Sequence, residues 1–245
     1  DAFEHTTWRR DFYPPGGDHR PYRVEFTKDM REDAQRRDFA VNALYMNISS
    51  GDILDPTGRG LNDAKKAVLE AAADDPDITI KDDGLRIMRM ARFAAELGFD
   101  VSPALFDAAR RHAPLLEAIS AERKLIELKK ILLSDTKYAF VTGGGPLHGL
   151  TLLRETGALA YVLPRLVKGD GVTQSTRYHS YDVLGHCLHA CAAAPPEWEL
   201  RLAALLHDIG WEGFFIVGGV VPLAAMLLLL LVPESLAFRV NRNPA

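Results

Sequence analysis

The stretch KDDGLRIMRMARF carries arginines at every third position, namely Arg86, Arg89 and Arg92. On a helix, residues three apart are offset by about 60° around the axis, so the three guanidinium groups share one broad stripe along the helix. A guanidinium offers a rigid fork of donors that matches the oxygens of phosphates and carboxylates. The stripe could therefore bind an anionic ligand.

Asp82 and Asp83 precede this stripe near the positive end of the helix dipole, where carboxylates are stabilised. Two interpretations remain open on spacing alone. In the first, the acids and arginines form ion pairs on a solvated helix face, each worth only a few tenths of a kcal/mol. In the second, an aspartate and an arginine match the hydrogen-bonding edge of a base, while the other arginines hold a triphosphate.

A second group of polar residues lies in the segment EDAQRRDFAVNALYM. Arg37 directly precedes Asp38, and Asn42 follows four residues later, so on a helical turn Asp38 and Asn42 would point the same way. Such a set suits contacts to a phosphate and a ribose hydroxyl. A plain helix N-terminus remains the alternative.

The third group consists of His186, His207 and Asp208, in RYHSYDVLGHCLHA and RLAALLHDIG, with His179 and His189 as supporting candidates. A single histidine on an apolar helix is usually a core residue. An adjacent His-Asp pair after an apolar helix is more specific, because imidazoles and carboxylates are ligands for divalent metals.

The elements that must position these groups belong to a folded protein of 245 residues, with 47% hydrophobic and 25% charged residues. The net charge of −4 gives no overall attraction to nucleic acid, so RNA binding would require a local basic surface. Cys187 and Cys191 lie four apart, which predicts two packed thiols rather than a disulfide and a reducing compartment.

The patterns predict an α+β, mostly α-helical fold. Residues 1–61 read as strands and turns, including a strand from Tyr22 to Phe26, and residues 62–167 show helical periodicity. Residues 168–177 read as a linker, and a second helical segment lies within 178–211.

The last part, 212–245, differs from the rest because residues 214–232 form an uncharged apolar run. A membrane span needs roughly 17–25 such residues. A buried core helix, an aberrant C-terminus and a span all remain open, so a membrane contact is expected only through this run.

Four ordered motifs give the sequence a family resemblance. RRDFAVNALYM, GDILDPTGRGLND, DDGLRIMRMARFAAELGF and ISAERKLIELKKIL resemble the patterns RRDFTxNA, DPxGGxxDL, EDxxRxxRxxRF and ERxxxELxKLL. These belong to the class II tRNA nucleotidyltransferases (CCA-adding enzymes) and the bacterial poly(A) polymerases. The resemblance implies the C-terminal part of a polymerase-β-like nucleotidyltransferase head at 1–61 and a helical neck and body at 62–167.

The resemblance also implies roles for the first two groups. Asp83 and Arg86 match the residues that pair with the edge of CTP or ATP, while Arg89 and Arg92 would face the triphosphate. Arg37 and Asp38 would contact phosphate and sugar, supported by Asn42. Structural roles at the head–neck–body junction are implied for a further set: Asp55, Asp63, Glu122, Arg123 and Glu127.

The catalytic carboxylates are expected to be incomplete. Nucleotidyl transfer uses Mg²⁺ held by clustered acids, and in this family two of them come from a DxD motif that would lie upstream of Asp1. The chain also begins without methionine, which predicts missing upstream sequence. Glu4, in an apolar-acid-apolar strand pattern, is the expected surviving acid, and this chain alone is expected to be inactive.

His186, His207 and Asp208 resemble the opening of the HD metal-dependent phosphohydrolases, which predicts a partial HD domain with a divalent metal. The match ends after Gly210, because the later aspartate ligand does not appear in the apolar tail.

The expected function is cytoplasmic addition of CCA to the tRNA 3′ end with CTP and ATP, and no DNA partner. Poly(A) addition, an HD phosphohydrolase and a non-catalytic RNA-binding remnant remain alternatives.

Overall fold

The structure is a computed structural model that describes residues 7–14, 21–139, 144–172 and 181–208. The strands are β1 Arg9–Phe12, β2 Arg23–Phe26, β3 Tyr45–Met46, β4 Ile53–Leu54, β5 Val68–Leu69 and β6 Asp100–Val101. The α-helices are α1 Met30–Gln35, α2 Gly60–Lys66, α3 Pro76–Asp82, α4 Arg86–Leu97, α5 Pro103–Arg111, α6 Ala121–Leu132, α7 Pro146–Glu155, α8 Leu159–Val162, α9 Val183–Ala193 and α10 Trp198–Leu206. The short 3₁₀ helices are η1 Ala40–Asn42, η2 Ala113–Ala118, η3 Ser134–Thr136 and η4 Leu166–Gly169.

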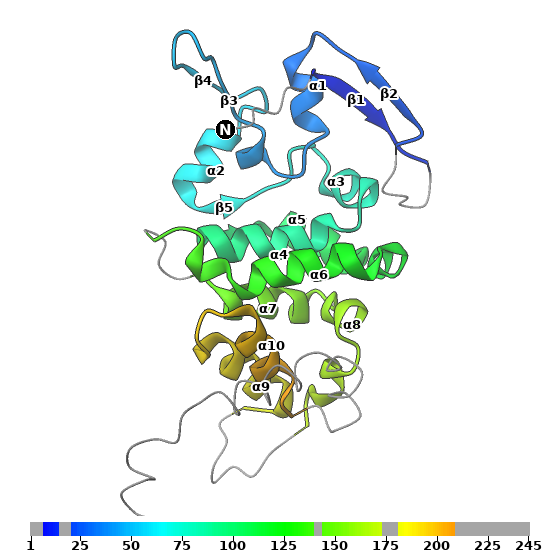
Figure 1. Cartoon of the computed structure of the whole chain (residues 1–245). Coiled ribbons are helices and arrows are strands. Elements are labelled where there is room, and N and C mark those ends of the chain that lie inside the picture. Colours follow the sequence, from blue (N-terminus) through cyan, green and yellow to red (C-terminus); the bar gives the residue numbers. More distant parts are fainter. Residues whose placement is uncertain (1–6, 15–20, 140–143, 173–180, 209–245) are drawn as a thin grey trace, which may run out of the picture.

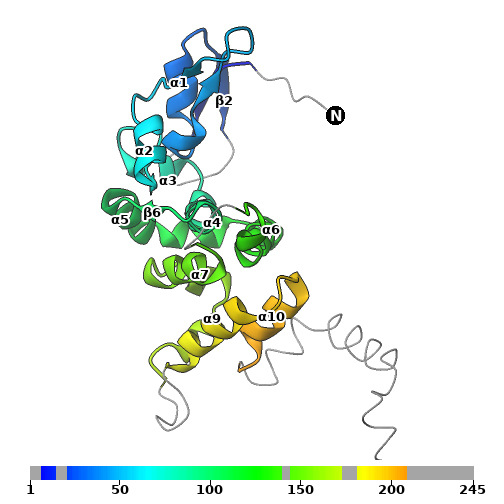
Figure 2. The same ribbon diagram turned by 90° about the vertical axis from the view of Figure 1, so that its left-hand side faces the viewer.

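The elements follow one another along an elongated molecule (Figure 1). The β1–β2 hairpin and α1 form one end, α4, α5 and α6 cross the middle, and α9 and α10 lie toward the other end, an order that the view turned by 90° also shows (Figure 2). The predicted α+β, mostly helical class is confirmed.

Three two-stranded sheets account for the strands of the described residues. The hairpins β1–β2 and β3–β4 are antiparallel, whereas β5 and β6 pair in parallel. The predicted strand at Tyr22 to Phe26 is confirmed as β2, which begins one residue later. The β5–β6 pair corrects the purely helical prediction for residues 62–167, since two residues of each strand are too few to show a period of two.

Helix α1 corrects the strand-and-turn prediction for residues 1–61. Asp29 is its N-cap, and its Oδ1 accepts a hydrogen bond from the backbone N–H of Arg31 at 2.8 Å. Glu32 and Asp33 occupy the first turn, where the helix dipole favours acids. An Asp followed three residues later by Glu is an N-terminal helix signal, so the sequence contained the cue for this helix.

The stretch that was expected to begin a single helix is divided between two. Asp82 ends α3, and Asp83 adopts an extended conformation, with its Oδ1 accepting from the N–H of Leu85 at 3.0 Å. At Gly84, an added Cβ would lie 2.8 Å from the Cβ of Leu115, closer than side chains tolerate. The glycine therefore lets the α3–α4 turn pack directly against η2.

Helix α4 is the centre of the core and packs against both α6 and α7. Its fully buried Ile87, Met88 and Met90 join a continuous cluster that extends from Phe39 in the first part of the chain to α10. Loss of such a buried side chain typically costs about 2–5 kcal/mol. The core thus fixes α4 between the two ends of the molecule.

Arg201 connects α10 to the end of α6. Its guanidinium donates to the carbonyl oxygen of Leu132 and forms a bidentate pair with Asp135, at 2.6 and 2.7 Å. The side chain is almost completely buried, and a buried charge is tolerated because it is paired and hydrogen-bonded. This contact fixes the α9–α10 pair against the central helices.

Cys187 and Cys191 are buried free thiols on α9, as expected. Burial raises the pKa of Cys187, and it raises the pKa of Cys191 to about 12. Across the described ranges, the search for a helix both apolar and long enough to cross a membrane finds none. The apolar run 214–232 and the rest of the tail lie outside the described residues.

Candidate functional site

A cavity of about 520 Å³ lies where the end of α1 meets the α3–α4 turn. Its lining consists of Arg36, Arg37, Asp38, Asn42, Asp83, Leu85, Arg86, Arg89, Phe93 and Arg123. Five arginines thus face two aspartates, a formal charge of +3 in a chain of net −4. The cavity is therefore a local basic surface that can attract a polyanion.

Asp38 and Arg89 form the charged centre of this cavity. The Nε of Arg89 donates to Asp38 Oδ2 at 2.8 Å, and its NH2 donates to the same oxygen. The other oxygen, Oδ1, accepts from Phe39 N at 2.9 Å and from Asn42 Nδ2 at 3.1 Å. The predicted pairing of Asp38 with Asn42 is found, but not on one helical turn: Phe39 between them is extended, and only Ala40–Asn42 form the 3₁₀ helix η1. Burial opposes the charge of Arg89, but the Asp38 carboxylate outweighs it and raises the Arg89 pKa.

Arg36 and Arg37 are both held by Asp33, a buried carboxylate that sequence reasoning did not single out. Asp33 Oδ1 accepts from Arg36 at 2.7 Å, and Oδ2 accepts from Arg37 at 3.1 Å and from the Tyr45 hydroxyl at 2.6 Å. Burial works against ionisation of Asp33, but these hydrogen bonds outweigh it and lower the Asp33 pKa. Burial, reinforced by the hydrogen bond to Asp33, raises the pKa of Tyr45 to about 12. The two arginines are thereby presented to the cavity in fixed positions.

Arg86 begins α4 and is largely buried. Its NH1 donates to the carbonyl of Thr79 at 2.9 Å, and its NH2 donates to the carbonyl of Arg36 at 2.6 Å. Asp82 Oδ2 lies 3.7 Å from Arg86 NH1. Arg86 therefore ties α1, α3 and α4 together at the edge of the cavity.

Asp83 lies opposite, and its Oδ2 accepts from Arg123 of α6 at 2.9 Å. Asp83 and Arg86, expected together, do line one cavity. The direct partner of Asp83 is Arg123, which sequence reasoning had given only a structural role.

Arg92 is the exception among the predicted arginines, and the prediction that it lines this pocket is wrong. Its Nε donates to Glu127 at 2.6 Å, and its NH1 donates to Glu96 at 2.9 Å. The guanidinium also lies 3.9 Å from the centre of the Phe93 ring, a cation–π contact. The reason is geometric: six residues after Arg86, Arg92 has turned about 120° around α4, toward α6.

The last predicted member of this group, Glu4, lies outside the described residues, as does the supporting candidate His179. Asp55 lies in the turn before α2, where its carboxylate accepts from Gly58 N and Leu61 N, both at 3.0 Å. Asp63 is buried, and burial raises its pKa.

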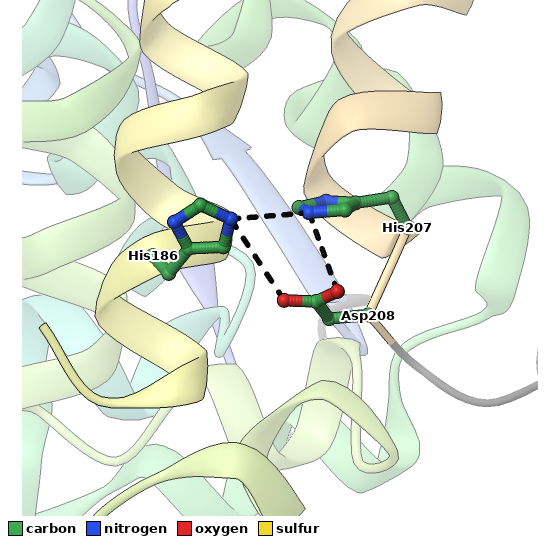
Figure 3. A group of neighbouring side chains, drawn as sticks. All are labelled: His186, His207 and Asp208. Carbon is green, nitrogen blue, oxygen red and sulfur yellow. Dashed lines mark hydrogen bonds and ion pairs between the residues drawn. The ribbon is translucent and has the colours of Figure 1, made fainter. Parts of the chain in front are cut away.

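The His-Asp group is brought together at the other end of the molecule (Figure 3). His186 points from α9 toward His207 and Asp208, which follow α10. The two Nε2 atoms lie 3.2 Å apart, and Asp208 oxygens lie 3.4 Å from His207 Nε2 and 3.9 Å from His186 Nε2. His189 instead stacks on Tyr181, with ring centres 4.0 Å apart.

The geometry of this group fits a metal ion. Two nitrogens bound at about 2.1 Å to a tetrahedral ion lie about 3.4 Å apart, close to the observed 3.2 Å. The Nδ1–H of His207 donates to the Ala204 carbonyl at 2.7 Å, which orients the ring with its Nε2 toward His186. Within the described ranges, this is the one group of three or more such side chains with ligand atoms within 4.8 Å of one another.

Comparison with known sequences finds two family models. Residues 1–70 match the poly(A) polymerase head domain, and residues 98–168 match the model described as the "probable RNA and SrmB-binding site of polymerase A". The CCA-adding enzyme of Streptococcus pyogenes serotype M5 (strain Manfredo) is 45% identical over 115 residues, which are 47% of this chain. The match covers only 28% of that relative's length.

Solved structures give the same result over more of the chain. The Bacillus stearothermophilus CCA-adding enzyme in complex with CTP is 29% identical with a TM-score of 0.63, covering 92% of this chain and 50% of that one. The Thermotoga maritima CCA-adding enzyme complexed with tRNA_CCA shares the fold at 19% identity and a TM-score of 0.53, covering 77% of this chain and 43% of that one. The resemblance carried by the four motifs is confirmed: the chain belongs to the class II tRNA nucleotidyltransferase (CCA-adding enzyme) and poly(A) polymerase family.

Proposed function

We propose that the arginine-lined cavity binds CTP and ATP, and that the protein adds CCA to the 3′ end of tRNA. The observation that carries this proposal is the convergence of five arginines on one cavity beside Asp83, in a chain whose overall charge is negative. CTP in the related Bacillus stearothermophilus structure supports it. Phosphate contacts would dominate the affinity for RNA and make it salt-dependent.

The geometry suggests a division of labour within the cavity. Arg89 holds Asp38 with Nε and NH2, which leaves NH1 for a phosphate oxygen. Arg37 and Asp38, with Asn42 fixing the carboxylate, are proposed to contact phosphate and ribose. Asp83 accepts from the base. Because these groups are held by protein partners before a ligand arrives, little ordering is needed on binding.

The family's reaction uses a divalent metal, and we propose Mg²⁺ for the intact protein. When bound, the ion would neutralise the leaving pyrophosphate and activate a 3′-hydroxyl. The described carboxylates of the cavity do not fit such a site, because Asp38 and Asp83 each bind an arginine. Glu4 stays a prediction as the family's third carboxylate.

Direct binding tests the nucleotide site in this chain. Titration calorimetry should show CTP and ATP binding that weakens with salt, and Arg89→Ala should weaken both. Arg110→Ala is a matched control, since Arg110 is an exposed arginine of α5 paired only with Asp107 in the described structure. No binding by the unaltered chain would contradict the proposal.

Activity distinguishes CCA addition from the poly(A) alternative in a protein that carries the complete head. That protein is offered a tRNA lacking CCA, with each nucleotide separately and together. Addition of two C residues and one A supports the proposal. Long tails made from ATP alone would instead identify a poly(A) polymerase.

The His-Asp group favours a second candidate function, a metal-binding HD-type module at 178–211. We propose that His186, His207 and Asp208 bind one divalent transition metal, on the strength of the ligand-atom distances given above. Metal analysis of the purified chain should find Mn, Fe, Ni or Zn, and His207→Ala should lose it. His189→Ala, on the same α9 helix as His186, should retain it. Purified chain without any of these metals, even after incubation with each, would contradict this candidate.

A further inference from the structure

Tyr45 is not among the residues that line the basic cavity, yet it contacts one of the arginines that do. It is the first residue of β3, and its ring packs against a small separate cluster of buried alanines, namely Ala34, Ala43 and Ala72. Trp8 meets the same ring edge-on, with the ring centres 6.2 Å apart. This packing restricts the positions that the Tyr45 ring can adopt.

The Tyr45 ring supports the guanidinium of Arg37. The central carbon of that guanidinium lies 4.9 Å from the centre of the ring, within range of a cation–π contact. The Tyr45 hydroxyl donates to Asp33 Oδ2 at 2.6 Å, and Arg37 NH2 donates to the same oxygen at 3.1 Å. Tyr45 therefore acts on Arg37 in two ways, directly through its ring and indirectly through Asp33.

These contacts leave part of Arg37 available to a ligand. A guanidinium has five N–H donors. In the described structure, Nε and NH2 donate to Asp33, and NH1 donates to the backbone carbonyl of Asn42 at 3.3 Å. Three of the five donors are thus used, which leaves one on NH1 and one on NH2. The side chain that carries them is 33% exposed and lines the cavity.

An arginine that is already held in place is a better ligand for an anion than a mobile one. Ordering a long side chain on binding lowers affinity by about two- to tenfold. The protein partners of Arg37 remove this loss, because they fix its guanidinium before a ligand arrives. A phosphate oxygen is the acceptor that suits the two remaining N–H groups.

We infer that Tyr45 is a positioning residue of the nucleotide site, which holds the Arg37 guanidinium so that its remaining N–H groups bind a phosphate oxygen of the nucleotide. This inference rests on the proposed nucleotide site. It adds a residue that lies two positions beyond the part of the sequence that matches RRDFTxNA. Because Tyr45 does not line the cavity, it acts through Arg37.

A double-mutant cycle tests whether Tyr45 acts through Arg37. Titration calorimetry measures the affinities for CTP and for inorganic tripolyphosphate, which has neither base nor sugar. The four proteins are the unaltered chain, Tyr45→Leu, Arg37→Ala and the double variant. Tyr45→Leu should weaken the binding of both ligands about fivefold. The same substitution should change either affinity by less than about twofold when residue 37 is already alanine.

Two further variants separate the contacts and provide a control. Tyr45→Phe keeps the ring beside Arg37 and loses only the hydroxyl bond to Asp33, so affinity should fall about threefold, again only while Arg37 is present. This variant carries the cycle if the urea midpoint shows that Tyr45→Leu does not fold. Met46→Ala alters the next residue of β3, which is 66% exposed, and should leave both affinities unchanged.

Three results would overturn the inference while leaving the proposed nucleotide site intact. The first is an equal loss of affinity from Tyr45→Leu with and without Arg37, since this indicates a role that does not pass through Arg37. The second is an unchanged affinity in Tyr45→Leu, and the third is an unchanged affinity in Arg37→Ala. If the unaltered chain bound neither CTP nor tripolyphosphate, the proposed nucleotide site and this inference would be refuted together.

Discussion

Arg89 and Arg92 are one turn apart on α4, yet the structure predicts opposite consequences for their loss. Arg92→Ala would leave Glu96 and Glu127, both about 95% buried, without their shared arginine, and only Glu127 would keep another cation, Lys130 at 3.1 Å. Breaking a buried ion pair from one side costs about 3–5 kcal/mol. Arg89→Ala would leave Asp38 with its hydrogen bonds from Phe39 N and Asn42 Nδ2, so we expect a cost of about 1–2 kcal/mol.

The assay has two parts, urea denaturation followed by circular dichroism and nucleotide titration under conditions where each variant is folded. Arg92→Ala should shift the urea midpoint strongly, with little change in m, while the nucleotide affinity of the folded fraction stays within about twofold. Arg89→Ala should show the reverse: a small midpoint shift and an affinity loss of about tenfold, as for one lost charge-assisted contact.

A compensated variant shows whether the cost arises from the uncompensated charges. Arg92→Met with Glu96→Gln and Glu127→Gln removes the three buried charges and leaves only the half-exposed Lys130 without Glu127. This variant should recover much of the stability lost in Arg92→Ala. A loss below about 1 kcal/mol in Arg92→Ala, accompanied by a tenfold loss of nucleotide affinity, would refute this reasoning and return Arg92 to the binding site.

Three further outcomes follow from local structure. Ala67 ends α2 in the left-handed region at φ 54°, so Ala67→Gly should raise the unfolding free energy by about 1 kcal/mol in urea denaturation; an unchanged or lower value would contradict this. Gly84→Ala should lower the same free energy by about 1–3 kcal/mol, because the new Cβ would lie 2.8 Å from the Cβ of Leu115; an unchanged free energy would contradict this. The Asp33 pKa is lowered in the folded state. The ionised carboxylate therefore stabilises the fold above its ordinary pKa near 3.8, and this stabilisation is lost as the pH falls through the lower folded pKa. Asp33→Asn should therefore be less stable than the unaltered chain at neutral pH, and the urea midpoints of the two should converge in strong acid; a constant difference at all pH values would count against this.

Short-range geometry was predictable from the sequence where the chain itself fixes it. Asp38 and Asn42 are four residues apart and their side chains do meet, although the chain between them is extended at Phe39 rather than a full helical turn. The spacing of four between Cys187 and Cys191 likewise predicted two packed thiols, and both are buried and free of a disulfide on α9. Order along the chain also predicted that Asp83, Arg86 and Arg89 would share one site, through the family pattern.

Contacts that depend on packing between distant elements were not predictable in this way. Asp38 binds Arg89 across 51 residues, and Asp83 binds Arg123 across 40. Nothing local to Arg123 indicates that the start of α6 reaches the α3–α4 turn. For Arg92 the helical spacing did contain the answer, since a stripe that drifts by about 60° per step faces different neighbours at its two ends.

Helix α6 links the basic cavity to α10, because its two ends are held by different elements. Arg123 near its start contacts Asp83 in the basic cavity, and the carbonyl of its last residue, Leu132, accepts a hydrogen bond from Arg201 of α10. A helix of 12 residues is a rod of about 18 Å that cannot shorten to absorb a displacement. A ligand that displaced the start of α6 would have to do work against the contact with α10 at its other end, so strain at the cavity would not stay local.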